Sequence, residues 1–109
     1  MLIPVQVTFR NMDPSSAVEE KVRERASKLE RRHANITRCH VVIEAPHRHH
    51  HKGRIFRVSV DLTIPGAELA TSGDSNHDHA HEDVYVAIRD AFMAVERRLE
   101  HFQGKREAD

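Results

Sequence analysis

The chain has 109 residues, and its 17 basic and 17 acidic side chains give a formal charge of zero when its ten histidines are neutral. This length suits one compact domain, and 39% hydrophobic with 31% charged residues indicates a soluble, folded chain. No apolar run approaches the length of a membrane span, and a single cysteine, Cys39, excludes an intrachain disulfide. Because the alternating start also lacks a signal-peptide core, we expect a cytoplasmic protein.

Alternating apolar residues predict a first strand over Leu2 to Arg10, and Pro4 near its start suggests an edge strand or a strand end. A helix should follow, with Asp13 as its N-cap and Pro14 at its first position, and should run to about Arg32. Its expected buried stripe is Val18, Val22, Ala26 and Leu29. A second strand over Thr37 to Glu44 would then pair in parallel with the first.

The second half of the chain predicts two more strands and a long helix. The strands cover Arg54 to Ile64 and Ala67 to Ser72, and Pro65-Gly66 forms a tight turn between them. The helix covers Glu82 to Phe102, with an apolar stripe of Tyr85, Ile88, Phe92, Val95, Leu99 and Phe102. We expect the tail, residues 102–109, to fray. The order β-α-β-β-β-α predicts an α+β fold, a single domain over residues 1–109 with a four-stranded mixed sheet and both helices packed on one face.

The first predicted helix carries a second stripe, made of Lys21, Arg25, Lys28 and Arg32. Helical spacing makes this stripe a continuous basic face, which suits contact with phosphate groups. A solvated face whose charges pair with Glu20 and Glu24 is an equally good interpretation.

Histidines gather in two predicted loops, His47, His49, His50 and His51 in one and His77, His79 and His81 in the other. The strand order places both loops at the same end of the sheet. Imidazole groups bind zinc or nickel, so these seven histidines are candidate metal ligands. The competing interpretation is a pair of solvated loops, because no spacing motif fixes a ligand geometry. Acidification would protonate these histidines and add positive charge to the two loops.

Four segments together resemble the ribosome hibernation-promoting factors, a family that includes the ribosome-associated inhibitor and the sigma-factor modulation proteins. They are Ser27 to Arg32, Ile36 to Glu44, Ile64 to Leu69 and Glu82 to Ile88, and the most specific is the Glu-Asp-x-Tyr-x-Ala-Ile run of the last. The chain is similar in length to the short form of the family. The resemblance implies a fold related to double-stranded-RNA-binding domains, and docking on the small ribosomal subunit between head and body. There the protein would overlap messenger and transfer RNA and silence idle ribosomes during stress or stationary phase.

The resemblance also implies which residues contact ribosomal RNA. Arg25, Lys28 and Arg31 match basic family positions in the first helix, and Arg97 matches an arginine in the last. With their basic neighbours, the candidate RNA-binding set is Lys21, Arg25, Lys28, Arg31, Arg32, Arg89, Arg97 and Arg98. Ala94, Glu100 and Gln103 stand at positions that are often basic in the family, so ribosome binding should either be weaker or shift to other basic groups, chiefly those of the first helix.

No phosphate-binding loop or catalytic-serine elbow is present, so we expect a protein that binds and does not catalyse. The expected partner is the small ribosomal subunit with its RNA, with no membrane, no small-molecule substrate and no required cofactor, and the free protein should be a monomer. The alternative is a histidine-rich metal-binding module that keeps the fold but has weakened or no ribosome binding. Cys39 should be a core residue, and Tyr85 either a core residue with its hydroxyl at the rim or a partner contact.

Overall fold

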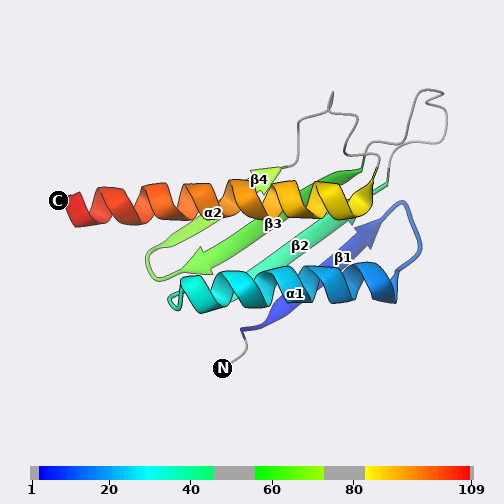
Figure 1. Cartoon of the computed structure of the whole chain (residues 1–109), viewed down its shortest axis with the longest axis horizontal. Helices are drawn as coiled ribbons and strands as arrows, with labels where there is room; N and C mark the ends of the chain where they lie inside the picture. The colour runs from blue at the N-terminus through cyan, green and yellow to red at the C-terminus, as the bar shows by residue number, and fades with distance from the viewer. Residues whose placement is uncertain (1–2, 46–55, 73–82, 109) are drawn as a thin grey trace.

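The structure is a computed structural model that describes residues 3–45, 56–72 and 83–108. The elements follow the order β1 (Val5–Arg10), α1 (Ser16–Arg32), β2 (Arg38–Glu44), β3 (Arg57–Ile64), β4 (Ala67–Ser72) and α2 (Val84–Ala108). The strands form one sheet in the order β1-β2-β3-β4. Both helices lie on the same side of this sheet and next to each other (Figure 1). The predicted α+β fold is confirmed for the described part of the chain.

The sheet is mixed, as predicted. Strand β1 pairs with β2 in parallel, and β2–β3 and β3–β4 are antiparallel pairs. The parallel pair follows from the α1 crossover, which returns the chain to the end of the sheet where β1 began. Pro4 directly precedes the edge strand β1, where a missing backbone N–H costs no ladder bond. Gly66 has a φ of 86°, so the turn between β3 and β4 uses the left-handed region that glycine enters without strain.

The core lies between the sheet and the two helices. Alternate residues of β2 and β3 face the helices and are buried, whereas the residues between them are only partly buried. Helix α1 covers the β1 side, and α2 covers β3 and β4. The predicted inward stripe of α1 is confirmed: Val18, Val22, Ala26 and Leu29 are all buried. On α2, Ile88, Val95 and Leu99 are fully enclosed, so this helix is the larger apolar cover of the sheet.

The start of α1 differs from the prediction. The N-cap is Ser15 and not Asp13, and the first helical residue is Ser16. The hydroxyl of Ser15 accepts a hydrogen bond from the backbone N–H of Val18 at 3.3 Å, with Ser15 in an extended conformation. A serine hydroxyl satisfies an N-terminal amide as well as an aspartate does, so the sequence Asp-Pro-Ser-Ser offers two caps. The cap used here leaves Val18 buried against the sheet.

Helix α2 also differs at both ends. It begins after Asp83, whose carboxylate Oδ1 accepts from the backbone N–H of Tyr85 at 2.9 Å. Tyr85 is 40% exposed, so it lies outside the core stripe to which the spacing assigned it. The helix continues to Ala108 instead of fraying after Phe102. The apolar stripe does end at Phe102, but the segment 105–108 consists of Lys, Arg, Glu and Ala, which all have a high helix propensity.

Candidate nucleic-acid interface

The outer surface of α1 has two distinct flanks beside its buried stripe. One flank faces the edge of the sheet: Arg23 Nη1 donates to the carbonyl of Val5 at 3.1 Å, and Glu30 accepts from the backbone N–H of Ile3 at 3.4 Å. The other flank, here named the basic flank, consists of Lys21, Arg25, Lys28 and Arg32. It is turned toward α2, because Arg32 reaches Glu96 of that helix.

Two residues of the basic flank form ion pairs, Lys21 with Glu24 and Arg32 with Glu96. Lys21 Nζ lies 3.0 Å from Glu24 Oε1, with both side chains well exposed, so this pair contributes little stability and can exchange for another anion. The pKa of the Glu24 carboxyl is held below its usual range, first by the hydrogen bond from Lys21 and by its charge, and then by Lys28 and Arg25. The positive charges of Lys21, Lys28 and Arg25 therefore act together on the Glu24 carboxylate. The predicted pairing of this face is confirmed for Lys21 with Glu24, whereas Arg25 and Lys28 act on Glu24 through their charge.

The candidate arginines of α2 do not share one face. Arg89 precedes Glu96 by two helical turns and so lies on the side toward α1, where it pairs with Asp90 at 3.0 Å. Arg97 points outward, and Arg98 lies one residue further round, toward β4. Both are exposed. The structure thus brings Arg89 to the basic flank, and it separates Arg98 from it.

The two helices run in the same direction (Figure 1), so residues that lie side by side on them keep a constant separation in the sequence. Arg32 contacts Glu96 at a separation of 64 residues. Because both helices rise equally per residue, the same separation places Arg25 level with Arg89 and Lys21 level with Tyr85. The start of the inter-helix surface is therefore basic, with an exposed aromatic ring beside it. Charged groups and exposed aromatics are the two features that hold nucleic acid.

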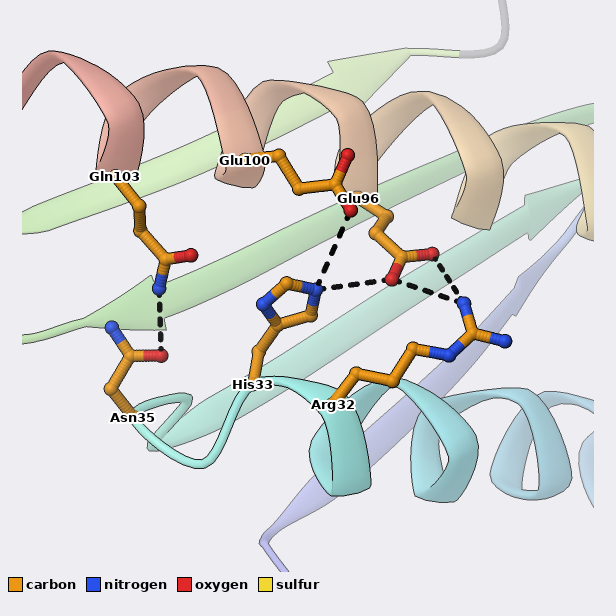
Figure 2. Close-up of polar contacts among 6 residues, drawn as sticks. All are labelled: Arg32, His33, Asn35, Glu96, Glu100 and Gln103. Atoms are coloured by element: carbon orange, nitrogen blue, oxygen red, sulfur yellow. Dashed lines mark hydrogen bonds and ion pairs between the residues drawn. The ribbon is translucent and has the colours of Figure 1, made fainter.

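The other end of this surface is acidic and closed by inter-helix contacts (Figure 2). Arg32 Nη1 donates to both carboxylate oxygens of Glu96, at 3.0 and 3.1 Å. His33 Nε2 lies 3.0 Å from Glu96, and Gln103 donates to the side-chain oxygen of Asn35 at 3.2 Å. Glu100 and Gln103 therefore face α1. This cluster was not predicted from the sequence, although the spacing of Glu96 and Glu100 by four residues was a signal that both carboxylates share a face.

The seven loop histidines predicted as metal ligands, His47, His49, His50, His51, His77, His79 and His81, lie outside the described residues. The strand ends from which their segments leave are at the same end of the sheet, because Glu44 pairs with Arg57 and Ser59 with Ser72. Within the described ranges, no helix is both long enough and apolar enough to cross a membrane.

Cys39 is a core residue, as predicted. Its side chain is fully buried in β2, and this burial, assisted by the negative charge of Asp61, raises the pKa of the thiol to about 12. At pH 8 to 9 we expect alkylation by iodoacetamide to be roughly a thousandfold slower in the native protein than in urea, because only the thiolate reacts. The measurement is mass spectrometry of the alkylated protein with time, and equal rates in the two states would contradict this assignment.

The buried thiol of Cys39 should also make the protein less stable at high pH. Because the native thiol pKa lies above the ordinary value of 9.0, the stabilisation is complete below pH 9 and is lost as the pH rises toward 12. Urea unfolding at pH 8 and pH 10.5 should therefore show a larger loss for the natural protein than for Cys39→Ala. If both proteins lose the same free energy of unfolding between pH 8 and pH 10.5, groups other than Cys39 cause the loss of stability at high pH.

Comparison with known proteins agrees with this fold. The family described as "Sigma 54 modulation protein / S30EA ribosomal protein" matches residues 5–107, nearly the whole chain. The chain belongs to this family. Membership agrees with the prediction of a protein that is not an enzyme.

Two relatives are named as ribosome hibernation factors. The chain is 31% identical over 100 residues to a "Ribosome hibernation promotion factor" of Deinococcus radiodurans, covering 92% of this chain but 49% of that protein. It is 26% identical over 113 residues to a "Ribosome hibernation promoting factor" of Azotobacter vinelandii, covering 96% and 94% of the two chains. The chain therefore spans about half of the first relative and nearly all of the second.

Two solved structures have a similar fold. A ribosomal subunit interface protein from Coxiella burnetii superposes with a TM-score of 0.73 at 16% identity, covering 94% of this chain and 99% of that one. The N-terminal domain of Protein Y from Thermus thermophilus gives a TM-score of 0.62 at 18% identity, with the same coverage. At these identities the likeness establishes the arrangement of strands and helices.

Proposed function

We propose that this protein is a ribosome hibernation factor that binds the small ribosomal subunit and occupies the path of messenger and transfer RNA. Family membership across nearly the whole chain supports ribosome binding. The position of the binding surface rests on one observation, the basic flank of α1, whose charges act together and lie beside Arg89 and Tyr85. The mechanism is steric: a folded domain held on ribosomal RNA excludes the RNA ligands of an active ribosome.

The chemistry of the flank suits RNA phosphates. Each cation that contacts a phosphate releases condensed counterions, so binding through this surface should weaken as salt rises. The ion pair between Lys21 and Glu24 is exposed and exchangeable, so Lys21 can turn to a phosphate at small cost. We place the centre of the RNA contact on four residues, Lys21, Arg25, Lys28 and Arg89. Arg31 and Arg97 lie at its margins, and Arg98 lies outside it, on the β4 side. Arg32 is already paired with Glu96.

The test is sedimentation of a stationary-phase lysate through sucrose at low and at moderate salt. The protein should travel with whole ribosomes, and it should follow the small subunit when lowered magnesium separates the subunits. Added excess messenger RNA with initiator transfer RNA should reduce the bound fraction, since the proposed positions overlap. Absence from ribosomal fractions at both salt concentrations would refute the proposal. Migration with the large subunit would refute its choice of subunit.

A further inference from the structure

The cluster that closes the acidic end of the inter-helix surface has the composition of a metal site. We propose that His33, Glu96 and Glu100 bind one divalent transition-metal ion of the zinc class, which holds the C-terminal end of α1 against α2. These residues differ from the seven histidines predicted as ligands from the sequence. The inference does not depend on ribosome binding.

The distances suit such an ion. His33 Nε2 lies 3.0 Å from Glu96 Oε2 and 4.0 Å from Glu100 Oε2, and the three ligand atoms all lie within 4.8 Å of one another. Bonds of about 2.0–2.1 Å from zinc to nitrogen and oxygen give about 3.3 Å between ligands in a tetrahedron. The observed distances of 3.0 and 4.0 Å between ligand atoms lie on both sides of this value. Small rotations of the side chains would therefore bring the ligand atoms to the spacing that zinc requires.

Each ligand is held by a rigid element. His33 caps α1, where its backbone N–H donates to the carbonyl of Leu29 at 3.0 Å. Glu96 and Glu100 are one turn apart on α2, so both carboxylates point toward the histidine, while the other ring nitrogen points away from them (Figure 2). Arg32 donates to both oxygens of Glu96, which orients this carboxylate as an outer partner does in metal sites.

Charge and exposure also favour a bound cation. Two carboxylates one turn apart on a helix repel each other, and the carbonyl end of α1 adds partial negative charge nearby. The side chains of His33 and Glu96 are 11% and 17% exposed, so they are partly shielded from water. Glu100 is 60% exposed, which leaves a path for the ion and room for a water molecule as the fourth ligand.

The experiment must separate this site from the loop histidines, which are candidate zinc ligands themselves. The reference protein is therefore the full chain with all seven loop histidines replaced by asparagine. Isothermal titration calorimetry of this protein with zinc chloride near neutral pH should show one ion per chain, and saturating zinc should raise its Tm by several degrees, because the ion binds only the folded arrangement.

Substitutions in that reference protein identify the ligands. His33→Gln should weaken zinc binding by more than about 100-fold and abolish the rise in Tm, and Glu100→Gln should weaken it at least about tenfold. Glu100 is exposed, so its isosteric substitution tests the site even where His33→Gln impairs folding. The matched control is His101→Gln, one residue further on α2 and exposed, which should leave zinc binding unchanged. Absence of stoichiometric binding, or binding that His33→Gln and Glu100→Gln leave intact, would show an ion-pair cluster only and would overturn the proposal.

Discussion

A triple variant, Lys21→Gln with Arg25→Gln and Lys28→Gln, should bind small ribosomal subunits roughly 100-fold more weakly at about 0.15 M salt. Each phosphate contact contributes about 0.9 to the slope of log K against log salt concentration, so three contacts represent about two powers of ten between 1 M and 0.15 M. The slope itself should fall by about 3. Filter binding or sedimentation over a series of salt concentrations measures both quantities.

The matched control removes three positive charges from the opposite side of the molecule. Arg10, Arg38 and Arg57 alternate with core-facing residues of β1, β2 and β3, so they lie on the sheet face that the helices leave open. Their joint replacement by glutamine changes the net charge equally but should leave the salt slope within about one unit of the natural protein. If both triple variants lose affinity equally, binding depends on total charge and the basic flank is not the contact surface.

Leu99→Ala should remove a large share of the stability of the domain. The Leu99 side chain is fully buried in the core, and truncation of such a leucine costs about 2–5 kcal/mol because the cavity only partly collapses. Domains of this size are stable by about 5–15 kcal/mol, so the loss is a large share of the total. Urea unfolding followed by circular dichroism gives the change in the free energy of unfolding.

Met93→Ala on the same helix is the control for that measurement. Met93 is 49% exposed, and alanine is at least as good a helix former, so its truncation should change stability by about 0.5 kcal/mol or less. A cost for Leu99→Ala below about 1 kcal/mol would mean that α2 is not the main cover of the sheet.

The elements of the fold were predictable from local patterns. Alternation of apolar residues located β2 and β3, and 3,4 spacing located the buried stripe of α1, because burial on one face imposes a period of two on strands and 3.6 on helices. Predictions at helix ends were weaker. Ser15 displaced Asp13 as the cap, and α2 continued past its apolar stripe, because several neighbouring residues satisfy the same local requirement.

The candidate interface was predictable in part. The stripe Lys21, Arg25, Lys28 and Arg32 follows from helical spacing within one element. The residues of α2 that lie beside this stripe could not be predicted in the same way. Arg89, Arg97 and Arg98 are close in sequence, but their places around α2 relative to α1 depend on which face of that helix packs on the sheet. Tyr85 fitted the core spacing yet lies 40% exposed, because the helix begins only just before it.

The sequence by itself thus determined the elements, their order and the presence of a basic stripe, since each depends on contacts or periodicity within a short segment. Only the tertiary structure decided what lies across from that stripe. The two helices run side by side in the same direction, and this places Arg25 level with Arg89 and brings His33 to Glu96 across 63 residues of chain. Such a meeting is set by how two apolar stripes pack on one sheet, a property of the whole core that no local pattern contains.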